Sequence, residues 1–230
     1  MPSPARFGTN FGTNAVASKI VITNVYIDGF NLYYGRLKGT PYKWLDLRAL
    51  SHILLPGDTL GMIRYFTARI DARPRDPDGP VRQDAYLRAL RTLPEVSIHL
   101  GLFKSRPTRM PLAHPQPGGP TTVEVIKTEE KGSDVNLATY LLLDAFRGDC
   151  DVSVVISNDS DLVEPIRVVR HDLAKPVGVI NPHPAHKRSR ELLAIGPTFY
   201  KQIRPAGVRR AQFAPVLNDS QGTIHRPSGW

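Results

Sequence analysis

Apolar and polar positions form two kinds of block along the chain, short β-rich runs and longer segments with helical spacing. The β-rich runs contain branched and aromatic residues and end at turn residues, and they predict strands over residues 20–28, 59–70, 95–103, 121–130, 151–157 and 175–182. Apolar residues spaced three and four apart predict helices over 31–36, 45–55, 81–93, 133–146 and 161–171. Strands that alternate with helices predict an α/β fold with a doubly wound, mainly parallel sheet.

Three segments do not fit this alternation. Residues 1–19 contain a duplicated FGTN and no apolar run, which predicts a disordered leader. Residues 104–120 are rich in proline, glycine and basic side chains, so we expect an exposed loop there. The sequence therefore predicts one domain over 20–204, followed by an extension, 205–230, that packs on the domain or trails from it.

Composition favours a soluble cytoplasmic protein. The 230 residues are 41% hydrophobic and 22% charged, which is ordinary for a globular domain with one sizeable core. Cys150 is the single cysteine, so no disulfide forms within the chain, which argues against a disulfide-stapled secreted domain and against a cysteine zinc site. No stretch approaches the roughly 18 to 20 apolar residues that span a bilayer, so neither membrane insertion nor export is expected.

The charge of the chain is strongly positive, at +9 with a pI near 9.8. Such a balance favours polyanionic partners, nucleic acid among them. The basic side chains gather in two runs outside the tail, which contain Lys104, Arg106 and Arg109, and Lys187, Arg188 and Arg190. Basic runs are often only solvated surface. Because these two flank acidic segments, a binding role is as well supported as a surface without one.

Four aspartates stand where apolar runs stop: Asp28, Asp134, Asp159 and Asp161. In an open α/β sheet the carboxyl ends of strands and the helix starts that follow them line one crevice, so we expect these acids to converge. Clustered carboxylates resist ionising together unless a cation neutralises them, and hard oxygen ligands suit Mg²⁺ or Mn²⁺. An Asx turn at Asp28 or an N-cap at Asp134 is the structural alternative for each acid alone.

Polar residues beside these acids are candidates for contacts to a phosphate or to water. Asn31 follows Asp28, Lys131 precedes Asp134, and the hydroxyl and amide groups around Asp159 belong to Ser157, Asn158 and Ser160. Asp144, in contrast, is expected to make an ordinary solvent or loop contact. The histidines, His183 and His186 included, are expected on the surface.

Several catalytic fingerprints are missing from the sequence. The chain has no GxGxxG, no GxxxxGK[ST], no GxSxG and no HExxH pattern. Dinucleotide-binding, P-loop, serine-hydrolase and zincin interpretations therefore lack their motifs.

The segments IDGFNLYYG, KGSDVNLATYLLLDAF and ISNDSDLVEPI, followed by VGVINP, resemble the NYN domain, and specifically its LabA-like bacterial branch within the PIN-like nuclease superfamily. The resemblance covers about residues 20–204. It implies a PIN-like three-layer α/β/α sandwich in which Asp28, Asp134, Asp159 and Asp161 bind Mg²⁺ or Mn²⁺ and cleave RNA. Two positions depart from the pattern, because Tyr140 stands where many relatives carry an aspartate and Asn158 replaces a common glycine.

The function predicted from the sequence is metal-dependent hydrolysis of phosphodiester bonds in RNA, with the acids activating a water. Lys131, Arg106, Arg109 and the cluster at 187–190 are expected to hold the backbone of single-stranded RNA. Two alternatives stay open, because a fold does not fix a function. The first is a non-catalytic module that binds nucleic acid or protein, and the second is an enzyme of other chemistry, an oxidoreductase or a phosphatase. The sequence also leaves a homodimer open.

Overall fold

The structure, a computed structural model, describes residues 20–72, 74 and 76–230, so the leader predicted over 1–19 lies outside it. A seven-stranded sheet forms its centre, with the strand order β4-β3-β2-β1-β5-β6-β7. The strands are β1 (Ile22–Asp28), β2 (Thr59–Ala68), β3 (Val96–Pro111), β4 (Thr122–Lys131), β5 (Val152–Ile156), β6 (Val177–Asn181) and β7 (Phe199–Gln202). Six of them run parallel, and β4 pairs antiparallel with β3.

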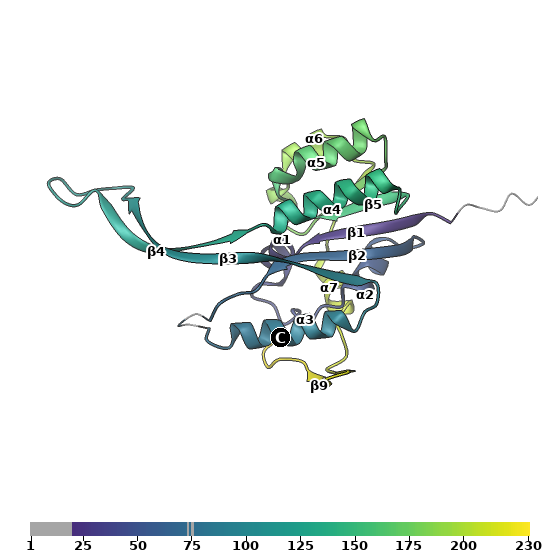
Figure 1. The fold of residues 1–230 in the computed structure, drawn as a ribbon, viewed down its shortest axis with the longest axis horizontal. Coiled ribbons are helices and arrows are strands. Elements are labelled where there is room, and N and C mark those ends of the chain that lie inside the picture. The colour runs from purple at the N-terminus through teal and green to yellow at the C-terminus, as the bar shows by residue number, and fades with distance from the viewer. Residues whose placement is uncertain (1–19, 73, 75) are drawn as a thin grey trace, which may run out of the picture.

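Helices cover both faces of the sheet (Figure 1). On one face lie α4 (Ser133–Arg147), α5 (Val163–Arg167) and α6 (Arg190–Ala194). On the other lie α2 (Leu47–Leu54), α3 (Gly79–Arg91) and α7 (Pro205–Arg210). Each face has its own apolar core, with Ile27 on the α3 side and Tyr26 on the α4 side. The predicted α/β class and three-layer α/β/α arrangement are confirmed.

Short helical segments complete the chain. They are α1 (Gly29–Leu32), the π-helical turns η1 (Tyr33–Leu37) and η3 (Val168–Asp172), and the 3₁₀ turns η2 (Ser160–Leu162) and η4 (Ala185–Lys187). The helix predicted over 161–171 is thus split into three consecutive pieces. No helix of the described residues is long and apolar enough to cross a membrane.

The order of the parallel strands has one switch point. From β1 the chain proceeds outward to β2 and β3 on one side, and then returns to place β5, β6 and β7 on the other. Ligands of open α/β sheets bind outside the carboxyl ends of the strands at such a point. Asp28 ends β1, and Asp159 follows β5, so both lie at the switch point.

The prediction of a loop over 104–120 is wrong for 104–111, which belong to β3, while 112–120 form the exposed connection to β4. Strand β3 continues to Pro111 and pairs with β4 through ten residue pairs, from Leu102 with Lys131 to Pro111 with Thr122. The two strands form a ribbon that projects away from the body of the protein (Figure 1). We call the paired segments 102–111 and 122–131 the β3–β4 ribbon.

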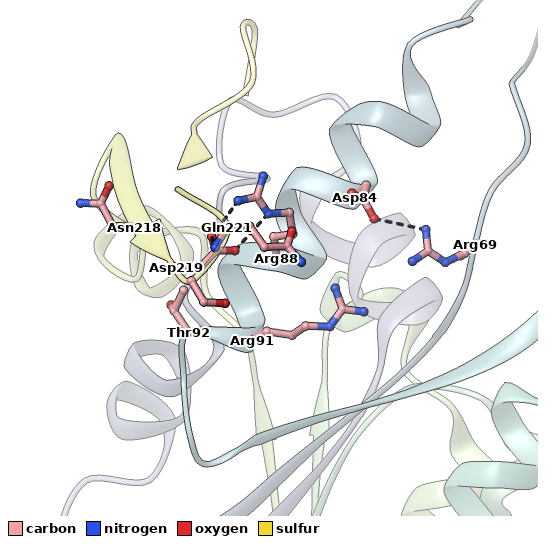
Figure 2. A pocket seen from close by; sticks show the side chains of 9 residues that line it. Arg69, Asp84, Arg88, Arg91, Thr92, Asn218, Asp219 and Gln221 are labelled. Atoms are coloured by element: carbon pink, nitrogen blue, oxygen red, sulfur yellow. Dashed lines mark hydrogen bonds and ion pairs between the residues drawn. The ribbon is translucent and has the colours of Figure 1, made fainter. Parts of the chain in front are cut away.

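The C-terminal segment packs on the body of the protein. It contains α7 and the hairpin of β8 (Val216–Asp219) and β9 (Gly222–His225), and Ile224 is buried in the core on the α3 side. The carboxylate of Asp219 accepts two hydrogen bonds from Arg88 of α3, at 2.8 and 3.0 Å (Figure 2). A bidentate pair of this kind fixes the hairpin against the helix.

Helix α4 is held to the sheet by a buried polar group that the sequence did not predict. Asp144 is 1% exposed, accepts a hydrogen bond from the Tyr26 hydroxyl at 2.8 Å, and is paired with Arg64 through two contacts of 2.7 and 2.9 Å. The expectation of a solvent or loop contact for Asp144 is therefore wrong. A buried carboxylate needs such partners, because an unpaired charge in the core is strongly destabilising.

Candidate functional site

Asp28 is the most buried of the candidate acids, with 4% exposure at the end of β1. Its Oδ1 accepts the Asn31 backbone N–H at 2.9 Å and caps α1, and its Oδ2 accepts the Ser157 hydroxyl at 2.9 Å. Burial raises the pKa of Asp28, while these two hydrogen bonds lower it. Asp28 therefore makes the local turn contact that was the structural alternative for it. Its second oxygen contacts the loop after β5, on the other side of the switch point.

The loop after β5 positions Asp159. The Ser157 hydroxyl oxygen accepts the Asp159 backbone N–H at 3.0 Å, so one serine joins Asp28 to this loop. Asp159 in turn caps η2, because its Oδ1 accepts the Asp161 backbone N–H at 3.0 Å. The polypeptide therefore fixes the orientation of both carboxylates through hydrogen bonds.

Asp134 reaches the same point from the first turn of α4. Burial is the largest cause that raises its pKa to about 7, and the negative charges of Asp28 and Asp159 come next. An aspartate with this pKa is partly protonated at neutral pH. The charges of the two neighbouring carboxylates thus add to the effect of burial.

These three acids form one group. One carboxylate oxygen each from Asp28, Asp134 and Asp159 lies within 4.8 Å of the other two. We call this group the aspartate triad. All its donors are hard oxygen atoms, and three carboxylates converge there, so the residues present fit a divalent cation of the Mg²⁺ or Mn²⁺ type.

Asp161, the fourth predicted acid, lies outside the triad. Its side chain is exposed, and it contributes its backbone N–H to Asp159. The negative charge of Asp161 is among those that raise the pKa of Asp134, although it supplies none of the three converging oxygens. That Asp161 also faces the crevice stays a prediction.

The predicted basic contacts are spread over the surface. Lys131 is exposed and its Nζ lies 3.5 Å from Glu129, while Arg106 and Arg109 lie on the β3–β4 ribbon, which projects from the body. Lys187, Arg188 and Arg190 are exposed, and Ser160 is exposed beside the triad. The structure thus places Asn31 and Ser157 in contact with the triad loops, and does not gather the arginines of the ribbon there.

A histidine that the sequence analysis assigned to the surface belongs to this site. His183 is half-buried, and its Nε2 lies 3.1 Å from Oδ1 of Asn31, which also accepts the Asn158 backbone N–H at 3.1 Å. Burial lowers the pKa of His183, with Lys187 and Arg36 adding to the effect. The imidazole is therefore neutral at pH 7 and donates its Nε2 proton. The one available signal was its position directly after a predicted strand.

The two departures from the family pattern have separate roles. Asn158 bridges to the segment after η4, because its Nδ2 donates to the Lys187 carbonyl at 2.8 Å and its Oδ1 accepts the Ser189 N–H at 2.7 Å. Tyr140 instead packs on His99, with ring centroids 4.1 Å apart, and under the guanidinium of Arg64 at 4.7 Å. Tyr140 therefore belongs to the polar network of α4.

A wide cavity lies away from the triad, between α3 and the β8–β9 turn (Figure 2). It measures about 590 Å³ and is open to solvent. Two of its three arginines are engaged in ion pairs, Arg88 with Asp219 at 2.8 Å and Arg69 with Asp84 at 3.2 Å. The first pair holds the C-terminal hairpin to α3, and we assign this cavity a structural role.

The fold and the site together define an open α/β protein with three convergent carboxylates at its switch point, and a relative of known activity identifies it as an enzyme. No family model matches the chain. It is 33% identical over 234 residues to 6-hydroxy-3-succinoylpyridine 3-monooxygenase HspA from Pseudomonas putida, an alignment that spans 90% of this chain and 75% of that protein. The chain belongs to the family of this monooxygenase.

A solved structure confirms the fold alone. A protein of unknown function from Vibrio parahaemolyticus superimposes with a TM-score of 0.52 over 82% of this chain and 96% of that one, at 14% sequence identity. Neither comparison mentions the NYN domain, so the resemblance to the LabA-like branch stays a prediction.

The prediction of a ribonuclease is contradicted by the relationship to a monooxygenase, which points to oxidoreduction. The same finding contradicts a hydrolase and favours the oxidoreductase that the sequence left open as an alternative. The physical reason for the error is that convergent carboxylates indicate a place for a cation or a proton. They do not encode which bond is broken there.

Proposed function

We propose that this protein is an oxidoreductase of the monooxygenase class that acts on a hydroxylated, nitrogen-containing aromatic ring. The observation that carries the proposal is the 33% identity to 6-hydroxy-3-succinoylpyridine 3-monooxygenase over 90% of the chain. The substrate in that name is a hydroxypyridine with a succinoyl arm. We expect a related single-ring compound as the substrate here.

A monooxygenase places one atom of dioxygen in its product and reduces the other to water. In the name of that relative, carbon 3, where the reaction takes place, carries the succinoyl arm, so the bond from the ring to the arm is the one that breaks. The substrate, O₂, two electrons and two protons balance as one ester, with the new oxygen between ring and arm, and one water. The two electrons come from an external donor, a reduced nicotinamide or a reduced flavin. Since GxGxxG is absent from the sequence, we expect the donor to act without a dinucleotide-fingerprint loop.

We assign the aspartate triad as the site of this reaction. Asp28, Asp134 and Asp159 would hold a divalent cation, Mg²⁺ or Mn²⁺, which supplies Lewis-acid polarisation of a bound oxygen ligand. The chain itself orients two of the three carboxylates through the Ser157 hydroxyl. Asn31 and the neutral His183 fix the loops on the other side of Asp28.

The test is oxygen incorporation by the purified protein. We expect consumption of O₂ when 6-hydroxy-3-succinoylpyridine and reduced nicotinamide or reduced flavin are both supplied with Mn²⁺, and one ¹⁸O atom from ¹⁸O₂ in the organic product. Asp28→Asn and Asp159→Asn should lower the rate by at least about 100-fold. Removing a residue that only hydrogen-bonds to a metal ligand lowers activity by about 10–100-fold, and loss of the ligand itself should cost no less. Asp149→Asn, at an exposed aspartate away from the triad, is the matched control.

Two results would refute the proposal. One is a product whose new oxygen comes from H₂¹⁸O while ¹⁸O₂ leaves no label. The other is turnover by Asp28→Asn at the rate of Asp149→Asn, which would remove the triad from the reaction.

A further inference from the structure

An aromatic cavity of about 220 Å³ lies on the α3 side of the sheet, beside α1. Its wall is drawn from segments far apart in the sequence: α1 and η1, β2, α3, the base of the β3–β4 ribbon, and the C-terminal residue. Six of its aromatic residues are Phe30, Tyr33, Tyr65, Tyr86, Phe103 and Trp230. We call it the aromatic cavity.

The rings of this cavity are held in fixed orientations. Tyr86 is 6% exposed and its hydroxyl donates to the Leu45 carbonyl at 2.9 Å. Its ring meets those of Tyr65 and Trp230 edge to face, with centroids 6.3 and 6.0 Å apart. Phe30 and Phe103 form a further edge-to-face pair at 5.4 Å. Such a pre-formed wall favours a flat aromatic ligand, because little side-chain entropy is lost when it binds.

The polar groups of the wall leave one cation free for a ligand. Arg82 is paired with Asp76, and Gln83 is engaged at both ends, because Nε2 donates to Ala68 and Oε1 accepts from Ile70. Lys43 has no acidic partner among the residues that the structure describes, and its Nζ lies 5.9 Å from the centre of the Trp230 ring. Both acids of the wall, Asp71 and Asp76, are exposed and screened by water.

The aromatic cavity and the aspartate triad are adjacent at the end of β1. Gly29 lines the cavity and directly follows Asp28. A Cβ on Gly29 would lie 2.8 Å from the Tyr65 hydroxyl and 2.7 Å from the Phe66 carbonyl oxygen, so only glycine lets the Tyr65 ring approach the strand end this closely. Tyr65 thus packs against the residue that directly follows Asp28.

We infer that the aromatic cavity binds a single-ring aromatic carboxylate, with the ring among the aromatic side chains and the carboxylate on Lys43. The inference rests on the proposed function for its connection to the triad. Size supports one ring, because a cavity of about 150 Å³ is enough for benzene and drug-sized ligands occupy about 300 Å³ or more. The positive charge of Lys43 selects the acid over its neutral amide.

Calorimetric titration of the intact protein tests this inference without turnover. The probes are 6-hydroxynicotinate and its neutral amide, in oxygen-free buffer that contains no electron donor. We expect Lys43→Gln to weaken binding of the acid about tenfold and to leave binding of the amide unchanged, because only the acid uses the charge. Trp230→Ala should weaken both probes about fivefold, since it removes a ring from the wall. Arg91→Gln, in the wide cavity of Figure 2, is the matched control.

Unchanged affinity in both Lys43→Gln and Trp230→Ala would overturn the inference by placing the ligand elsewhere, and so would the lack of any binding to the wild type at millimolar probe. Equal losses for acid and amide in Lys43→Gln would refute the role of its charge. Binding that follows the expected pattern in a protein that fails to incorporate oxygen would support the cavity assignment and refute the proposed monooxygenase.

Discussion

Replacing Asp134 with asparagine should stabilise the folded protein above neutral pH. The pKa of Asp134 in the fold is about 7, against an ordinary value near 3.8 for an aspartate in the unfolded chain. Between about pH 4 and pH 7 the folded state therefore holds a proton that the unfolded state has released. The free energy of unfolding consequently falls as pH rises through this window, and the penalty is complete above pH 7.

The size of the effect follows from this pKa and from exposure. A fully buried carboxyl with this pKa would destabilise the fold by about 4 kcal/mol. Asp134 is only half-buried, so solvent screening reduces that figure to about half. The positive end of α4 returns about 0.3–1 kcal/mol in favour of the carboxylate. We expect Asp134→Asn to gain about 1–2 kcal/mol at pH 8, or about 3–6 °C in Tm for a chain of this size.

The assay is thermal unfolding at pH 4.5 and pH 8, in buffer with EDTA and in buffer with Mn²⁺. Wild type and Asp134→Asn should differ little at pH 4.5 and by the full amount at pH 8. Mn²⁺ should reverse the order at pH 8, because a cation at 100 times its Kd stabilises the wild type by about 2.7 kcal/mol. Asp149→Asn should stay within about 0.5 kcal/mol of wild type throughout. A lower Tm for Asp134→Asn in EDTA at pH 8 would show that the carboxylate is a structural partner.

Two further predictions concern the frame around the site. Asp144→Ala should lower the free energy of unfolding by about 3–5 kcal/mol in chemical denaturation, because Arg64 and the Tyr26 hydroxyl lose their buried partner. The exposed control Asp172→Ala should lose less than about 1 kcal/mol, and an equally small loss for Asp144→Ala would contradict this account. Gly29→Ala should lower the free energy of unfolding by about 1–3 kcal/mol in the same measurement, since the new Cβ would lie 2.7 Å from the Phe66 carbonyl oxygen. Gly119→Ala should be neutral, because its new Cβ has ordinary contacts from 3.4 Å. Equal effects of the two substitutions would refute the close approach of Phe66 and Tyr65 to Gly29.

The central strands and long helices could be predicted from the sequence because their signals are local. The run 20–28 forms β1 over Ile22–Asp28, and the apolar spacing over 133–146 forms α4 over Ser133–Arg147. Since parallel strands end at one edge, the meeting of Asp28 and Asp159 follows from the order of elements alone. Asp161 could not be assigned to the triad in this way, because the order of elements does not predict the 3₁₀ turn on which it lies.

Strand β4 was predicted over 121–130, but the extension of β3 over 104–111 was not, because the composition of that segment is typical of a loop. Pro107 and Pro111 lie within β3, which a strand tolerates where the missing N–H faces solvent. The aromatic cavity was missed for a different reason. Phe30, Tyr86 and Trp230 come from three separate segments, and only the tertiary structure brings their rings into one wall. The reaction itself could not be derived from carboxylates that suit several chemistries.

The projection of the β3–β4 ribbon gives the three carboxylates of the triad unequal rigidity. A two-stranded ribbon without a covering layer is marginally stable in water, so it opens locally at a free energy far below that of global unfolding. Asp28 and Asp159 are attached to the two central strands of the sheet. Asp134, in contrast, follows β4 after Gly132 and Ser133, so its helix begins where the ribbon ends. A molecule that binds the ribbon would therefore act on the segment that leads directly into one of the three carboxylates of the triad.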